Sequence, residues 1–91
     1  MKKIDPRKIR DCAGRLARTR LALGFKTQTA FAEEIGIQQY LYNPLETGKR
    51  RVSLDVALKI RDKLGIPLDW IYCGDDSRLP TALYKVLQER K

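Results

Sequence analysis

Residues 28–47 constrain the fold of this chain more than any other stretch, because two short apolar patterns flank a single glycine, Gly36. In each pattern the apolar side chains recur at the spacing that places them on one face of a helix. They are Phe31, Ala32 and Ile35 before the glycine, and Tyr42 and Leu45 after it. Glycine takes the left-handed backbone of a tight turn at no steric cost. The stretch therefore predicts two short helices packed across a turn, the pattern of a helix-turn-helix.

Helical patterns also occupy most of the remaining chain, and no segment has the alternation of a strand. Capping residues and prolines indicate where helices start, and glycines indicate where they stop. The predicted starts are Asp5–Pro6, Thr27, about Gln39, Ser53, Pro67 and Pro80. The predicted inward residues are Ile9, Ala13, Leu16, Arg20 and Leu23 in the first helix, Leu54, Ala57, Leu58, Ile60 and Leu64 in the fourth, and Trp70 and Ile71 in the fifth. We therefore expect an all-α fold, a compact bundle of about five helices plus a C-terminal helix.

The charge of the chain favours a polyanionic partner. There are 19 Lys and Arg against 11 Asp and Glu, which gives a net charge of +8. A basic surface gains affinity for phosphates through counterion release, although many small proteins are basic without binding nucleic acid. The 91 residues suffice for one core but leave little for an enzyme cleft, and the chain has no histidine. We therefore expect no catalysis, no cofactor and no metal site.

Two cysteines and the distribution of apolar residues bear on the cellular compartment. Cys12 and Cys73 lie far apart without metal-ligand spacing. We interpret both as reduced thiols, buried or half-buried, in a reducing cytosol. No apolar run approaches the ~20 residues that span a bilayer, and the first residues lack the apolar segment of a signal peptide. We expect a cytoplasmic protein without a membrane partner.

Five short segments follow one another at characteristic spacings: RLALG (20–24), TQTAFA (27–32), IGI (35–37), LETGKRR (45–51) and LGIPLDWIYCG (64–74). In this order they resemble the lambda-repressor-like helix-turn-helix domains of phage repressors, Cro proteins and Xre-type regulators. The resemblance covers Leu16 to about Gly74. It implies sequence-specific binding of double-stranded DNA, usually by a homodimer on a pseudo-palindromic operator. We expect a DNA-binding domain at 1–78 and a helical extension at 79–91 that is a candidate for dimerisation.

The resemblance also implies roles for individual residues. Arg20 and Glu46 match a buried ion pair that ties the first helix to the end of the third, the recognition helix. Gln28 matches a residue that hydrogen-bonds a phosphate and braces that helix, and Gln39 is the best candidate for a base contact, because an amide can pair bidentately with adenine. The full set of implied DNA contacts is Gln28, Thr29, Gln38, Gln39, Tyr40, Asn43, Thr47, Lys49, Arg50 and Arg51. The alternative for the amides and the basic loop is that they are merely solvated.

Pro44 is unusual inside a recognition helix. Proline removes one helical hydrogen bond and clashes with the carbonyl four residues earlier, that of Tyr40, at a cost of ~3 kcal/mol. Gln38 is also a poorer helix cap than the serine or threonine usual in the family. We predict that this helix persists but is kinked or begins late, so that its side chains are presented differently.

The sequence leaves a rival function and two packing arrangements open. A protein-interaction module such as an antitoxin can use the same fold, although no long acidic or disordered arm is visible.

The apolar side of the last helix, formed by Leu83, Val86 and Leu87, can pack on a second copy and place two recognition helices ~34 Å apart. It can equally fold back on its own core. No segment indicates a small-molecule sensor.

Overall fold

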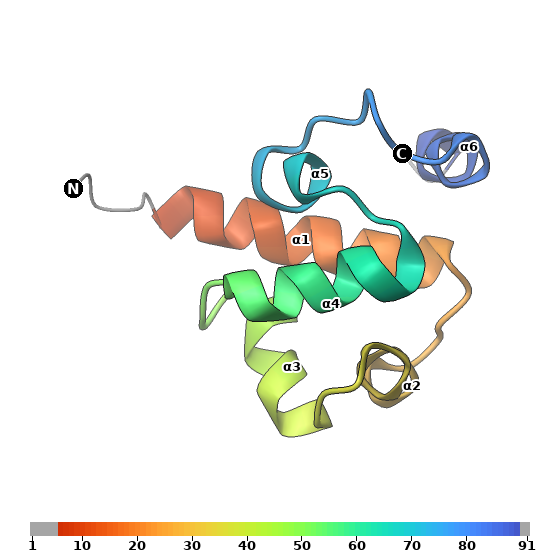
Figure 1. The fold of residues 1–91 in the computed structure, drawn as a ribbon. Helices are drawn as coiled ribbons and strands as arrows, with labels where there is room; N and C mark the ends of the chain where they lie inside the picture. The colour runs from red at the N-terminus through yellow and green to blue at the C-terminus, as the bar shows by residue number, and fades with distance from the viewer. Residues whose placement is uncertain (1–5, 90–91) are drawn as a thin grey trace.

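The computed structural model describes residues 6–89, with side chains from residue 9 onward, and this part of the chain consists of six α-helices (Figure 1). They are α1 (Pro6–Ala22), α2 (Gln28–Ile35), α3 (Gln39–Glu46), α4 (Leu54–Leu64), α5 (Leu68–Cys73) and α6 (Thr81–Glu89). The described residues form no strand, so the predicted all-α fold is confirmed. The predicted cap Asp5 lies outside the described residues. None of the helices between residues 6 and 89 combines the length and the apolar composition that a membrane span requires.

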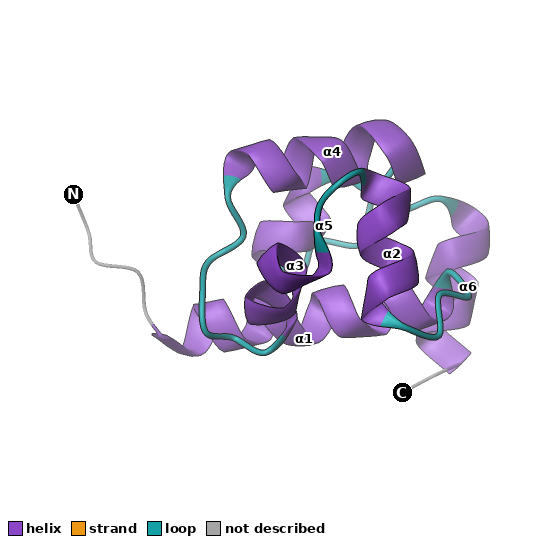
Figure 2. Ribbon diagram, turned by 90° about the horizontal axis from the view of Figure 1, so that it is seen from below, coloured by secondary structure: helices purple, strands orange, loops and turns teal. Residues whose placement is uncertain are grey.

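The long helix α1 is the central element of the fold. It contacts α3, α5 and α6, while α2 contacts α3 and α4. In Figure 1, α2 and α3 lie on one side of α1, and α5 and α6 lie on the other. Figure 2, seen from below, therefore shows α2 and α3 foremost. The two helices of the predicted helix-turn-helix thus share one end of the molecule.

Local capping chemistry accounts for where the helices begin and end. The side chain of Thr27 accepts a hydrogen bond from the Ala30 amide at the start of α2, and Ser53 accepts one from Val56 at the start of α4. Gly36 and Gly65 end these helices in the left-handed conformation, which residues with a Cβ adopt only under strain. All four predicted boundaries are confirmed.

The core contains the predicted apolar faces, with two corrections. Trp70 and Ile71 are buried, and the indole nitrogen of Trp70 donates to the hydroxyl of Thr19 at 2.9 Å. Leu54, expected inside, is 59% exposed at the first residue of α4. Cys73, expected to be at least half-buried, is exposed at the end of α5. Cys12 is buried as predicted.

The last helix folds back on the core of its own chain. Leu83 and Leu87 are buried in the same apolar cluster as the core residues of α2 and α4, and α6 packs against α1. Val86 is only partly buried. Of the two arrangements left open by the sequence, the structure has the one in which α6 packs on the core of its own chain. Leu83 and Leu87 can contact a second copy only if α6 leaves this position.

Replacing Leu83 with alanine should lower the free energy of unfolding by about 2–5 kcal/mol, because the deletion leaves a cavity in the core. The neighbouring Tyr84 is 41% exposed, so Tyr84→Ala serves as the control and should stay within about 0.5 kcal/mol of the parent. Urea unfolding followed by circular dichroism measures both. Equal stability of the two variants would show that α6 contributes nothing to the core.

Candidate nucleic-acid interface

The turn between α2 and α3 is closed by backbone hydrogen bonds. The Ile37 amide donates to the Ala32 carbonyl at 2.9 Å, and the Gly36 amide donates to the Glu33 carbonyl at 3.1 Å. This pair of bonds is the Schellman motif, which requires the left-handed residue that Gly36 supplies at φ 82°. The direction in which the chain enters α3 is therefore set by backbone geometry.

Packing then fixes α3 against α2. The side chain of Phe31 is fully buried, and its ring lies 5.4 Å from that of Phe25 and 5.2 Å from that of Tyr42, measured between centroids. Such tilted and edge-on arrangements are the favoured ones for aromatic pairs. Ala32 is also fully buried, and a small side chain there allows the two helices to approach closely. The exposed side of α3 is thus held rigidly.

An ion pair ties the end of α3 to α1, as the resemblance implies. Arg20 Nη2 lies 2.9 Å from Glu46 Oε1, and Arg20 Nε donates to both carboxylate oxygens at 3.2 and 3.1 Å. The third guanidinium nitrogen donates to the Phe25 carbonyl at 2.8 Å. The hydrogen bond with Glu46 raises the pKa of Arg20 above its ordinary value. This two-pronged contact fixes the orientation of α3 more strictly than a point contact would.

The Tyr42 hydroxyl is buried and has no hydrogen-bond partner among the described residues. Burial raises the pKa of Tyr42 well above its ordinary value, and the carboxylate of Glu46 adds to the effect. Because the charged phenolate is disfavoured in the fold, the folded chain retains this proton at pH values where the unfolded chain has lost it. The pKa shift therefore links stability to alkaline pH.

Tyr42 should make the fold sensitive to pH above about 10, the ordinary pKa of tyrosine. In that range the folded state binds more protons than the unfolded state, so its stability is intact below pH 10 and falls as the pH rises, by up to about 1.4 kcal/mol per unit. Urea unfolding of the parent and Tyr42→Phe at pH 8 and pH 11 measures the effect. Other ionising groups are common to both proteins, so an equal loss in both would contradict the assignment to Tyr42.

Gln28, the first residue of α2, is hydrogen-bonded to two of the predicted contact residues in α3. Its side-chain oxygen accepts hydrogen bonds from the amide of Asn43 at 2.8 Å and from that of Gln39 at 3.4 Å. This brings the first residue of α2 against α3, the bracing role that the resemblance implies. Since the oxygen is occupied, Gln28 offers its amide nitrogen, a donor, to a further group such as a phosphate oxygen.

The remaining predicted residues of this face are exposed. Thr29, Gln38 and Thr47 are accessible, and the Thr47 hydroxyl donates back to the Asn43 carbonyl at 3.0 Å. Tyr40 is 65% exposed, whereas Tyr42 is buried, as expected. Leu41, which was not among the predicted residues, is 46% exposed beside Tyr40. Leu41 lies four residues before Leu45 and so on the same helical side, and spacing alone therefore gave no signal of its exposure.

Pro44 is accommodated within α3. The helix begins at Gln39, so the expectation of a late start is wrong, and it continues through Pro44 to Glu46. Proline has no amide hydrogen, so the Tyr40 carbonyl lacks its usual helical partner. The predicted kink stays a prediction. Gln38 makes no side-chain capping bond, which confirms that it is a poor cap.

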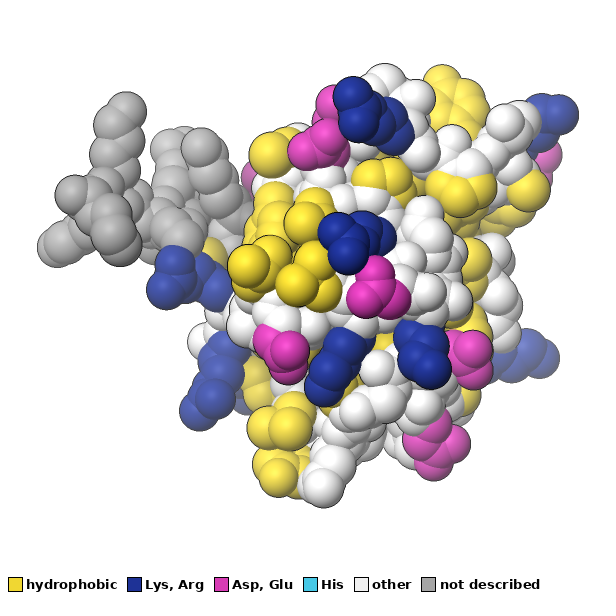
Figure 3. Space-filling model, in the orientation of Figure 1, with side chains coloured by type: hydrophobic (Ala, Val, Ile, Leu, Met, Phe, Trp, Pro, Cys, Tyr) yellow, Lys and Arg dark blue, Asp and Glu magenta, His cyan; other side chains and the backbone are white. Residues whose placement is uncertain are grey.

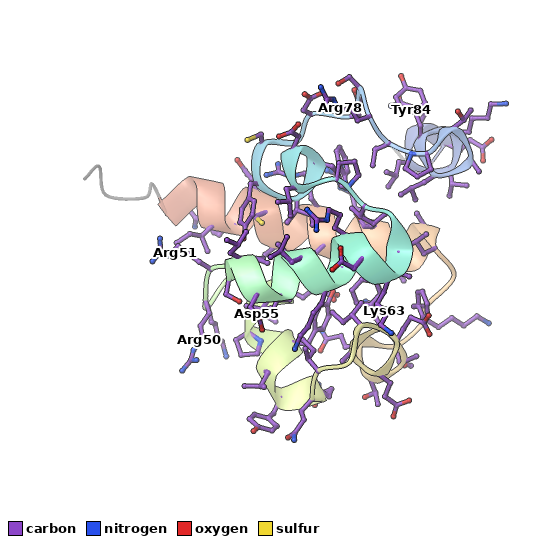
Figure 4. The ribbon with its side chains drawn as sticks, viewed as in Figure 1. Arg50, Arg51, Asp55, Lys63, Arg78 and Tyr84 are labelled. Atoms are coloured by element: carbon purple, nitrogen blue, oxygen red, sulfur yellow. The ribbon has the colours of Figure 1, made fainter. Side chains whose placement is uncertain are left out.

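The basic loop that follows α3 is anchored on the same proline. The Pro44 carbonyl accepts hydrogen bonds from the amides of Lys49 at 2.9 Å and Arg50 at 3.1 Å, across the turn that Gly48 forms at φ 80°. The side chains of Lys49, Arg50 and Arg51 are all exposed. In Figure 4, Arg50 extends beside α3, whereas Arg51 extends toward the beginning of α1. The structure thus places cationic groups directly after the exposed face of α3.

Comparison with known proteins finds a family at these residues. A family model described as helix-turn-helix matches residues 16–71, more than half of the chain. Neither curated proteins nor solved structures give a significant match. The matched range includes α2, α3 and the basic loop, and so contains every residue of the predicted contact set.

Proposed function

The chain belongs to the lambda-repressor-like helix-turn-helix family, and we propose that it is a repressor that binds a pseudo-palindromic operator as a dimer. In general terms, membership makes it a DNA-binding helix-turn-helix regulator with DNA as its partner. The proposal is narrower: α3 enters the major groove and reads base edges, and the bound protein blocks access of the polymerase to a promoter.

The observation that carries the proposal is the hydrogen bonding of Gln28, the first residue of α2, to Gln39 and Asn43 of α3. A side chain reads a base well only if its donors and acceptors are held in position before binding. Gln39 retains its carbonyl oxygen and a second amide hydrogen, the pair of groups that adenine N6 and N7 require. Gln28 supports it from α2 while offering a donor to the backbone.

Affinity for DNA that does not depend on the DNA sequence would come from residues at the two ends of α3. Gln28 and the N-terminus of α2 lie at its start, and Lys49 and Arg50 lie at its end. Backbone amides at a helix start and cationic side chains are both favourable partners for phosphate oxygens. Such contacts fix the register of the protein on DNA, while the side chains of α3 between them supply the selectivity.

Dimerisation is proposed because a pseudo-palindromic site matches two copies related by a two-fold axis. The extension at 79–91 remains a candidate for the contact. Because Leu83 and Leu87 are buried in their own core, the contact would use the exposed side of α6, which includes Tyr84. The Tyr84→Ala control described above therefore also reports on the dimer if its molecular mass is measured.

Selection of bound duplexes from a random DNA pool at two salt concentrations tests the proposal. We expect enrichment of a pseudo-palindromic sequence that persists at the higher salt, because base contacts are less salt-sensitive than phosphate contacts. Gln39→Ala should lose the preference at one base pair of each half-site. Binding that enriches no sequence and disappears at the higher salt would refute the proposal and direct attention to a protein partner.

A further inference from the structure

A groove with largely apolar walls lies beside the basic loop, and the proposed contacts with DNA bases do not use it. It is bounded by α1, by the loop that precedes α4 and by α5, and its volume is about 690 Å³. Its apolar walls are formed by Ile9, Val52, Leu54 and Tyr72. We call it the α4 groove. Its volume falls within the range of small-molecule sites in proteins.

The walls of the α4 groove are held in place and are left partly uncovered. The Tyr72 hydroxyl donates to the Val52 carbonyl at 2.8 Å, which links α5 to the loop before α4. Leu54 is 59% exposed and Tyr72 is 38% exposed, so a ligand that covered them would remove apolar surface from water. Figure 3 shows hydrophobic side chains gathered on this part of the surface, with Lys and Arg side chains at their edge.

The charge at the groove is positive. Arg50 and Arg51 both line it, and both side chains are exposed. Figure 4 shows them extending from the loop in different directions, with Arg51 toward the beginning of α1. An occupant with an apolar body and an anionic end would satisfy both features: the body covers Leu54 and Tyr72, and the anion pairs with a guanidinium.

We propose that the α4 groove binds a small amphiphilic carboxylate, and that this ligand competes with DNA for the arginines. A second copy of the chain fits less well, because a two-fold contact would bring another Arg50 and Arg51 to the same rim, and like charges would face each other. A sugar-phosphate backbone would satisfy the arginines but would leave the apolar walls uncovered. The expectation of no small-molecule ligand came from the sequence, which did not reveal that these segments meet.

The consequence for DNA binding rests on the proposed function. Arg50 and Arg51 belong to the loop assigned to phosphate contact, so an arginine paired with a bound carboxylate is lost to the DNA backbone. The ligand should weaken DNA binding, and DNA should weaken ligand binding by the same factor. The protein would then release its site when the ligand accumulates.

Calorimetric titration with decanoate, below the concentration at which it forms micelles, tests the site without DNA. Decanol has the same tail without the charge, and acetate has the charge without the tail. We expect saturable one-to-one binding of decanoate, with decanol and acetate each bound at least ten-fold more weakly. Equal binding of decanol and decanoate, or no saturable binding of decanoate at all, would overturn the proposal.

Two variants locate the binding. Leu54→Glu places a negative charge in the groove and should abolish decanoate binding; it should not unfold the protein, because an acidic residue in the first turn of a helix is favourable. Leu21→Glu, a matched change of a leucine that is 39% exposed near the end of α1 and does not line the groove, should leave the affinity within two-fold. Thermal melting checks that both are folded. Unchanged binding by Leu54→Glu would show that decanoate lies elsewhere and would overturn the assignment.

A final titration separates the ligand site from its effect on DNA. Decanoate is added to the complex with the duplex obtained by selection, and fluorescence anisotropy follows release. We expect release with the parent protein and none with Leu54→Glu. Decanoate binding without any release would overturn the competition. Failure of the selection itself would instead refute the proposed function, and would leave the calorimetric result for the groove standing.

Discussion

Replacing Glu46 with alanine is expected to lower the free energy of unfolding by about 3–5 kcal/mol. The Arg20 and Glu46 side chains are only 10% and 5% exposed, so the change leaves a guanidinium buried without its counter-charge. Only the hydrogen bond from Arg20 to the Phe25 carbonyl would remain. Domains of this size have total stabilities of about 5–15 kcal/mol, so a large fraction would be lost. Urea unfolding at neutral pH measures the change.

Two controls separate the cost of an unpaired buried charge from the value of the pair. Asp55→Ala breaks the Lys59–Asp55 pair on the surface of α4, whose side chains are 42% and 80% exposed, and should cost no more than about 0.5 kcal/mol. The double variant Arg20→Met with Glu46→Leu removes both charges and should recover much of the stability lost by Glu46→Ala. If the double variant is as unstable as Glu46→Ala, the loss comes from packing and not from the uncompensated charge.

Replacing Lys49 and Arg50 with alanine is expected to weaken DNA binding mainly through its salt dependence. Each phosphate contact contributes about 0.9 to the slope of log affinity against log salt, so the slope should fall by about 1.8. At 0.1 M salt this corresponds to roughly 60-fold weaker binding. Arg51 is left in place because it extends toward the beginning of α1, whereas Arg50 extends beside α3 (Figure 4). Anisotropy titrations of the selected duplex at several salt concentrations give both quantities.

A matched control tests whether position or total charge matters. Arg18 and Arg78 are exposed, Arg18 lies over the Trp70 ring of α5, and Arg78 lies across α1 from α3 (Figure 4), so replacing both removes the same charge away from the interface. This variant should keep nearly the full slope. The Lys49/Arg50 variant should also enrich the same sequence as the parent, because phosphate contacts position the protein and do not read bases. A changed sequence preference would place these residues at base edges.

The comparison of sequence and structure separates two kinds of information. Thr27 and Ser53 cap α2 and α4, and Gly36 and Gly65 end them, as predicted. Capping depends on groups within three or four residues of each other, so the sequence alone specifies it. The buried stripes of α2 and α3 were predicted for a related reason, because the helical repeat determines which side chains share a face.

The sequence by itself therefore determined the helices, their ends and the all-α class, and the resemblance supplied the Arg20–Glu46 pair. Only the tertiary structure decided what covers each helical face, because this depends on residues distant in the sequence. It exposed Leu54 and turned Leu83 inward, although both lie on apolar stripes. It also joined Gln28 to Asn43, 15 positions apart, and brought α1, α5 and the basic loop together around the α4 groove. Helical periodicity predicts which face of a helix is apolar, but the packing of the whole chain determines which element buries that face.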